Sequence, residues 1–279
     1  MSDTGPSGGR RCLNCEQPLH GEFCSHCGQR DLPTRRALGE LVREAVGEAL
    51  QVDGRVPRTL VPFLFNPGRL IRDYNAGRRA RYTSPFRLFL ATTLLWLASS
   101  LAFGLGSATD EDPGSAGVVS LDLPPDFTGP EAGIGRWVID RMHEYSQLPQ
   151  AEQVRRSRSA IRETAPKAAL ALVPVFALLA KVLFWSRRRP RFYAEHLVFA
   201  LVLHAFAFLL LAIGLAADGL EFGLAALAVL VVYLYACLWR GYEAGWWASL
   251  MRLLAILIVY PILLTLVASV MLIGNLLID

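Results

Sequence analysis

The chain has 279 residues, of which 53% are hydrophobic, and a formal net charge of +4. Most of the apolar residues lie after Phe86, in runs long enough to cross a bilayer, which excludes an ordinary soluble domain. The positive charge is almost entirely arginine. In a membrane protein such residues mark the cytoplasmic side, so nucleic-acid binding is the less favoured explanation. Nothing before Phe86 combines a basic start with an apolar core, and we expect no cleavable signal peptide.

Two CxxC motifs near the N-terminus give the strongest chemical signal. Each CxxC turn brings two thiolates together, and two turns can enclose one ion in a tetrahedron of sulfur atoms. We expect a disordered tail over residues 1–11 and a zinc ribbon with short β-hairpin knuckles over residues 12–30, folded by its metal. Iron, a redox pair and disulfides are the alternatives, but disulfides would need an oxidising compartment. Gly28 follows the second motif, where a positive φ suits the turn. The predicted ligands are Cys12, Cys15, Cys24 and Cys27.

Two segments connect this ribbon to the apolar part of the chain. Residues 34–53 have the 3.6-residue period of an amphipathic helix, whose apolar face would need the membrane domain, a second copy or lipid as partner. Residues 57–85 form an arginine-rich juxtamembrane segment, in which the apolar run 60–65 is too short to span and suggests an interfacial or re-entrant piece. Its arginines either contact anionic lipid or hold the cytoplasmic end of the first span. They are Arg69, Arg72, Arg78, Arg79 and Arg81.

Residues 86–279 read as an all-α membrane domain of about five transmembrane helices. A polar loop over residues 107–164 separates the first span from the rest, and apolar residues between 134 and 148 predict a helix on the outer surface. The expected spans cover residues 86–105, 166–185, 194–217, 220–239 and 253–278.

The distribution of charge predicts the orientation of these spans. Four arginines crowd the short connection Arg187–Arg191, which we place in the cytoplasm, whereas residues 218–221 carry two acids and no base. This pattern puts the N-terminus inside the cell and the C-terminus outside, which would be the periplasm in a bacterial inner membrane.

Ionisable side chains within predicted spans are candidates for function. His204 lies near the middle of the third span, with Tyr233, Tyr235 and Tyr260 as partners from the next two helices. Glu195 and His196 lie at the cytoplasmic mouth of the third span. A neutral His204 that forms a hydrogen bond between helices is the favoured structural explanation.

Three sequence segments resemble the bacterial domain-of-unknown-function 3667 family. They are the ribbon ending in Cys27-Gly28-Gln29-Arg30, the stretch Gly77–Tyr82 with Pro85, and Glu195–Ala200. The resemblance covers most of the chain except the long loop. It implies a bacterial inner-membrane protein with an N-terminal zinc ribbon and a helical membrane domain. The family has no established activity, so no catalytic residue carries over.

These observations favour a non-enzymatic adaptor or scaffold. A cytosolic zinc ribbon would present a docking surface to a cytosolic protein, while the helical bundle lies in the bilayer and self-associates or holds a partner. A small transporter that uses the His204 group is the first alternative, and an intramembrane lipid-modifying enzyme based on Glu195 and His196 is the second. The sequence contains no Walker-type phosphate loop and no HExxH motif.

Overall fold

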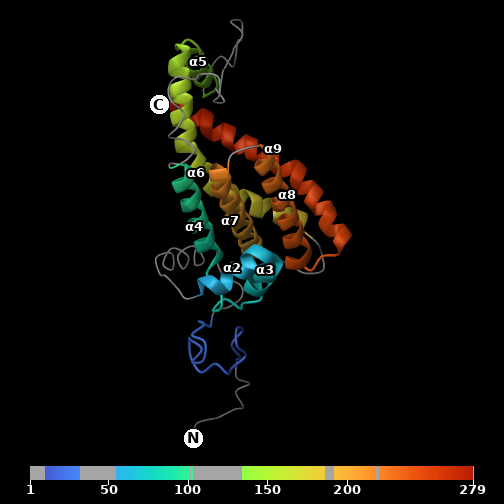
Figure 1. Cartoon of the computed structure of the whole chain (residues 1–279). Coiled ribbons are helices and arrows are strands. Elements are labelled where there is room, and N and C mark those ends of the chain that lie inside the picture. The colour runs from blue at the N-terminus through green and yellow to red at the C-terminus, as the bar shows by residue number, and fades with distance from the viewer. Residues whose placement is uncertain are drawn as a thin grey trace. The chain divides into compact units, whose positions relative to one another are not determined.

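The computed structural model describes residues 10–31, 55–100, 102, 134–185, 192–217 and 220–278 (Figure 1). The predicted helix over 34–53, nearly all of the predicted tail and the Arg187–Arg191 connection lie outside these residues. The chain divides into two compact units. The first comprises Met1–Leu105 and Phe176–Leu257, and the second comprises Gly106–Val175 and Ile258–Asp279.

The ribbon is built from two similar turns. The Cys12 N–H donates to the Gln17 carbonyl over 2.9 Å, and twelve residues later the Cys24 N–H donates to the Gln29 carbonyl over 2.8 Å. An isolated antiparallel bridge closes each turn, Arg11 with Pro18 and Phe23 with Arg30. The expected β-hairpin knuckles are therefore not confirmed: a single isolated bridge closes each turn, and the described residues contain no strand.

The rest of the described chain is helical apart from its connections. Proline begins several helices, at the position where its missing N–H costs no hydrogen bond. The helices are α2 (Val56–Phe65), α3 (Pro67–Asn75), α4 (Pro85–Ser99), α5 (Ile134–Ser146), α6 (Gln150–Leu183), α7 (Tyr193–Ala217), α8 (Leu220–Ala236), the π-helical turn η2 (Cys237–Gly241) and α9 (Trp246–Ile278).

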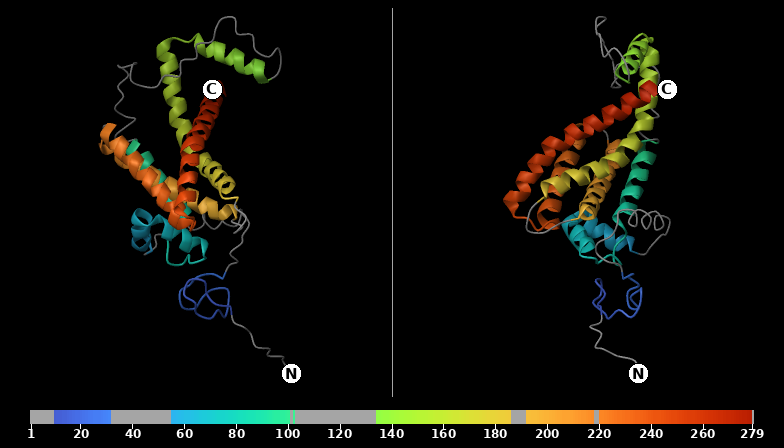
Figure 2. Two further views of the ribbon diagram at one scale, coloured as in Figure 1. Left: turned by 90° about the vertical axis from the view of Figure 1, so that its right-hand side faces the viewer. Right: turned by 180° about the vertical axis from the view of Figure 1, so that it is seen from behind.

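Aromatic side chains form much of the core of the first unit. Phe208 of α7 packs against Phe89 and Trp96 of α4, with ring centroids 5.8 and 5.2 Å apart. Phe63 of α2 lies against Phe206 of α7 and Tyr233 of α8, at 6.0 and 6.5 Å. These contacts hold α2 and α4 against α7, and α3 lies next to α2 (Figure 2).

The second unit contains α5 and the polar first part of α6. Tyr145 packs with Leu148 and Ala160 in a small core, and its hydroxyl donates to the Gln153 carbonyl over 2.9 Å. Glu152 pairs with Arg155 and Arg156 along α6 at helical spacing. The helix expected between residues 134 and 148 is thus present as α5, and α6 begins before the predicted second span because these local pairs support a polar helix.

Three of the described helices are long and apolar enough to cross a membrane: Tyr193–Leu215, Glu221–Gly241 and Trp246–Met271. They correspond to the third, fourth and fifth predicted spans. Helix α4 and the apolar part of α6, Leu170–Leu183, are shorter. A membrane protein is therefore indicated, but a count of five spans is not confirmed.

Candidate metal centre and its docking loop

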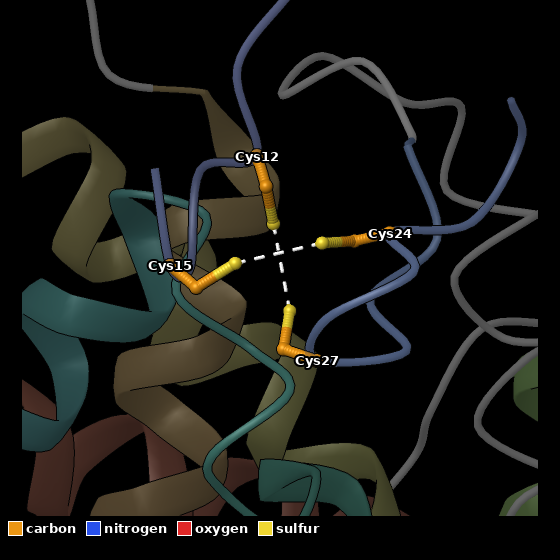
Figure 3. A group of neighbouring side chains, drawn as sticks. All are labelled: Cys12, Cys15, Cys24 and Cys27. Carbon is orange, nitrogen blue, oxygen red and sulfur yellow. Dashed lines mark hydrogen bonds between the residues drawn. The ribbon is translucent and has the colours of Figure 1, made fainter. Parts of the chain in front are cut away.

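The four ribbon thiols converge on one point (Figure 3). Their sulfur atoms all lie within 4.8 Å of one another, with Cys12 and Cys27 3.6 Å apart and Cys15 and Cys24 3.5 Å apart. A tetrahedral ion with metal–sulfur bonds of about 2.3 Å would separate its sulfurs by about 3.8 Å, whereas a disulfide needs about 2.05 Å. All four cysteines are free thiols. The donor set thus fits a metal ion rather than disulfides.

The pKa values of two of the four thiols are shifted in opposite directions. Backbone N–H groups, first that of Cys27 and then that of His26, lower the pKa of the Cys24 thiol to about 6 despite its burial. At Cys15 the backbone hydrogen bond at Gln17 favours the thiolate, but burial and the neighbouring sulfurs raise the pKa to about 12. Cys24 therefore favours its thiolate, whereas Cys15 keeps its proton unless a cation replaces it, and metal binding at Cys15 would release that proton.

Positive φ angles shape both turns. Glu16 follows the first CxxC motif with φ 62°, and Gly28 follows the second with φ 71°. This confirms the expectation for Gly28. The Glu16 and Gly28 N–H groups donate to the carbonyls of Cys12 and Cys24, both over 2.8 Å. These hydrogen bonds close the turns and point the two thiols of each motif inward.

The ribbon is held by a loop of the membrane-associated part of the same unit. The Gln29 side-chain nitrogen donates to the Gly77 carbonyl over 2.9 Å. Its oxygen accepts hydrogen bonds from the N–H groups of Arg79 and Ala80, each over 3.1 Å. One amide thus satisfies three main-chain groups between α3 and α4. We call residues 77–83 the docking loop.

Two further contacts align the first turn of the ribbon with the docking loop. A Cβ at Gly77 would come within 2.7 Å of the Leu13 side chain, and Gly77 itself has φ +87°. The Arg81 guanidinium donates to the Asn14 carbonyl over 3.4 Å. Leu13 and Asn14 are the two central residues of the first CxxC motif, so the metal-binding turn itself forms part of the contact.

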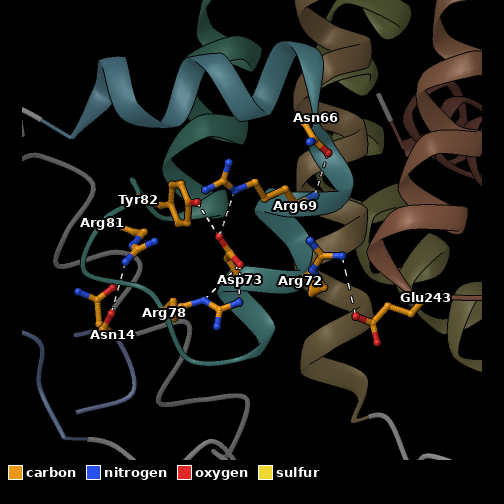
Figure 4. Close-up of polar contacts among 9 residues, drawn as sticks. All are labelled: Asn14, Asn66, Arg69, Arg72, Asp73, Arg78, Arg81, Tyr82 and Glu243. Atoms are coloured by element: carbon orange, nitrogen blue, oxygen red, sulfur yellow. Dashed lines mark hydrogen bonds and ion pairs between the residues drawn. The ribbon is translucent and has the colours of Figure 1, made fainter. Parts of the chain in front are cut away.

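Asp73, at the end of α3, fixes the docking loop from the other side (Figure 4). It is 5% exposed, forms an ion pair with Arg78 and accepts a hydrogen bond from the Tyr82 hydroxyl over 2.8 Å. Burial acts to raise the pKa of Asp73, but the hydrogen bonds from Arg78 and Tyr82 outweigh it and hold that pKa below its ordinary value of 3.8. Burial and the bond to Asp73 raise the pKa of Tyr82. Asp73 is therefore a buried carboxylate that orders the loop.

The five arginines predicted to contact lipid all have partners within the protein. Arg69 and Arg78 approach Asp73, and Arg72 lies 3.9 Å from Glu243. Arg79 lies over the Tyr74 ring at 5.3 Å, and Arg81 contacts Asn14. These contacts support the structural explanation. Arg69 and Arg72 remain about half exposed, at 58% and 44% of their side chains, so lipid contact stays a prediction.

The residues of the predicted His204 group each contact other parts of the protein. The His204 Nδ1 lies 2.8 Å from the Ala200 carbonyl; a carbonyl only accepts, so Nδ1 carries the proton. The ring contacts the edge of Phe176. The Tyr233 hydroxyl donates instead to the Phe63 carbonyl of α2. Tyr235 packs near Trp239, and Tyr260 belongs to the second unit. A functional cluster of these residues stays a prediction.

His196 lies in an aromatic stack at the start of α7. It is 1% exposed, and its Nδ1 is 2.8 Å from the Tyr242 hydroxyl. Tyr242 in turn stacks on Phe184, with ring centroids 3.9 Å apart. Glu195 precedes His196 on the same helix, half-buried. This packing ties the ends of α6, α7 and α8 together.

Sequence reasoning found the four cysteines but missed Gln29 and Asp73. Gln29 belongs to a motif that was recognised, Cys27-Gly28-Gln29, yet its partners are 48 to 51 residues away. The repeat of the two turns could have pointed to Gln29, because both turns end in glutamine, Gln17 and Gln29. Gln29 forms the hydrogen bonds to the docking loop.

Comparison with family models matches residues 53–97 to the family described as "Protein of unknown function (DUF3667)". The match confirms the resemblance seen in the sequence, and it covers α2, α3 and most of α4. Comparison with curated proteins gave no match, and neither did comparison with solved structures.

Proposed function

We propose that this chain, similar to the DUF3667 family over residues 53–97, is a non-enzymatic adaptor of the bacterial inner membrane. In this proposal a zinc ribbon in the cytosol presents a protein-binding surface. The helical bundle anchors it, with α4 and the apolar part of α6 crossing the bilayer beside the three longer helices, and with the C-terminus in the periplasm.

The metal centre supports a structural role for zinc. Zn²⁺ prefers tetrahedral sulfur ligands, and four thiolates leave no open coordination position for a substrate or a reactive water. Cys12, Cys15, Cys24 and Cys27 would hold the ion, and the ion would supply folding free energy rather than a reactive group. A reducing cytosol would keep these thiols available for the metal.

The observation that carries the proposal is the Gln29 contact. A ribbon that served only to bind metal could be attached through a flexible linker. Here the Gln29 side chain instead fixes the ribbon to the backbone of Gly77 and Ala80. Fixed attachment gives the ribbon a defined orientation relative to the bundle, which is what an adaptor needs to position a partner. The ribbon also exposes Phe23, whose surface is 58% accessible.

A photo-crosslinking experiment in cells tests the adaptor role. The photoreactive residue p-benzoylphenylalanine replaces Phe23 in the full chain, and adducts are identified by mass spectrometry after irradiation. We expect one dominant cytosolic protein adduct that disappears with Cys24→Ser and weakens with Gln29→Ala, while membrane insertion is unchanged. An equally strong adduct in Cys24→Ser, or no protein adduct at Phe23, contradicts the proposal.

A further inference from the structure

Helix α2 has two apolar faces, of which the protein covers one. Thr59 and Phe63 are buried, at 0% and 1% exposure. One turn apart on another face, Val61 and Phe65 are 64% and 79% exposed. No charged residue lies between Arg58 and Arg69. A soluble surface helix would place polar residues on its second face.

The contacts of α2 place its C-terminal end inside the span of α8. The Tyr233 hydroxyl donates to the Phe63 carbonyl over 2.8 Å. Tyr233 precedes Gly241, the end of that candidate span, by eight residues, which is about 12 Å of helix. Thr59 and Gly68, on either side of Phe63 in the sequence, contact groups at or beyond the ends of apolar helices. The Thr83 N–H, just before α4 begins, donates to the Thr59 hydroxyl, and Gly68 packs on Arg240 at the end of the span.

In a bilayer, the chain would therefore enter the apolar layer at Thr59, reach its deepest point near Phe63 and Phe65, and return to the interface at Gly68. Such a path resembles a re-entrant segment, in which backbone polar groups must be satisfied without water. In a continuous helix the Phe63 carbonyl would accept from residue 67, but Pro67 has no N–H. Tyr233 supplies the missing donor.

The turn between α2 and α3 is satisfied in the same way. The Asn66 N–H donates to the Pro62 carbonyl over 2.9 Å, and the Asn66 carbonyl accepts from Arg69 over 3.0 Å. The Asn66 side chain also accepts from the Arg69 N–H over 3.4 Å. The N–H, the carbonyl and the side-chain oxygen of Asn66 thus all have partners within the chain.

We propose that α2 and the turn after it form a re-entrant element whose exposed face, Val61 and Phe65, contacts the acyl chains of the leaflet at the arginine-bearing ends of α7 and α8. The inference rests on the chain being a membrane protein, but not on the adaptor role. Acyl chains fit better than water or a second copy because Val61 and Phe65 flank Phe63, whose carbonyl is bound by Tyr233 within the candidate span of α8, and because no charged residue interrupts this face. Arg58 and Arg69 flank it at the polar interface.

Photo-crosslinking to lipid tests this element in the intact chain. p-Benzoylphenylalanine replaces Phe65, Val61 or, as the matched control, Phe23 of the ribbon. Each purified variant is placed in vesicles of phosphatidylethanolamine and phosphatidylglycerol, irradiated and analysed by mass spectrometry. We expect lipid adducts at positions 65 and 61 at least tenfold above those at position 23.

Two results would overturn the inference: lipid adducts at position 65 no stronger than at position 23, or crosslinked dimers in place of lipid adducts. Metal content equal to that of the unmodified chain shows that each variant is folded. Because the adaptor test reads protein adducts at Phe23 in cells, a failure of one proposal is distinguishable from a failure of the other.

Discussion

The side-chain nitrogen of Gln29 donates a hydrogen bond to the Gly77 carbonyl over 2.9 Å, joining the metal-binding ribbon to the loop that leads into α4. Gln29 is two residues beyond Cys27, so the position of its amide depends on the turn that the metal would hold. An ordered ribbon therefore stabilises an ordered docking loop, and the reverse, through the Gln29 side chain.

Gln29→Ala should release the docking loop without removing the metal site. It removes three hydrogen bonds, each worth about 1 kcal/mol, so we expect amide exchange at Arg79 and Ala80 to accelerate by about tenfold or more. Hydrogen-exchange mass spectrometry measures this. Gln17→Ala, the equivalent change in the first turn, is the control and should leave the loop protected. Equal exchange in both variants would contradict the docking contact.

Asp73→Asn should destabilise the first unit by about 1–3 kcal/mol, because it removes a buried charge that Arg78 and Tyr82 both contact. Thermal unfolding in detergent measures the loss. Asp140→Asn is the control: its ion pair with Arg136 is exposed on both sides and should contribute little. An unfolding shift no larger than that of the control would refute this role of Asp73.

The same carboxylate should make stability depend on pH. Its pKa is lower in the folded chain than its ordinary value of 3.8. The folded state therefore gains stability above pH 3.8, and this gain is lost as the pH falls through the lowered pKa. The unfolding midpoint of the parent protein should decline more steeply below pH 4 than that of Asp73→Asn. Parallel curves would count against the assignment.

Glu16→Gly should stabilise the metal-bound ribbon by about 1 kcal/mol, because Glu16 holds a φ of 62° that glycine adopts without strain. Gly28→Ala should destabilise the metal-bound ribbon. Gly28 also has a positive φ, and because an added Cβ would meet nothing within 4 Å, the loss would come from backbone strain alone. Metal loss to a competing chelator ranks the variants. Gly21→Ala, also in open space and without a positive φ, should match the parent.

Tyr233→Phe should cost about 1–2 kcal/mol of stability, because it leaves the Phe63 carbonyl without the donor that replaces the missing Pro67 N–H. Tyr235→Phe is the matched control on the same helix and should change stability by less than about 0.5 kcal/mol. Unfolding in detergent compares the two. Indistinguishable midpoints would mean that the hydroxyl does not support α2.

Local patterns predicted much of this structure, whereas contacts distant in sequence were not predictable. The CxxC spacing predicted the sulfur cluster because each motif is one turn, and the apolar runs predicted α7, α8 and α9 because length and hydropathy are local properties. The beginning of α6 was missed because its support comes from ion pairs such as Glu152 with Arg156 rather than from apolar period.

The role of the arginines illustrates the same limit. A run such as Arg78–Arg81 is chemically suited to lipid phosphates, and nothing local distinguishes that use from pairing with protein groups. The structure pairs Arg78 with Asp73, five residues away, and Arg81 with Asn14, which is 67 residues away. Neither Asn14 nor Gln29 carries a charge, so no charge pattern could have identified them as partners of the docking loop.

Hydrogen exchange in the docking loop, measured with the metal bound and after its removal, tests whether the ion holds the ribbon on the loop. The purified chain should contain about one zinc ion, and chelation in a reducing buffer should remove it. We expect the amides of Arg79 and Ala80 then to lose their protection, as is also expected for Gln29→Ala. Unchanged protection after complete loss of metal would contradict the claim that the ion holds the ribbon on the loop.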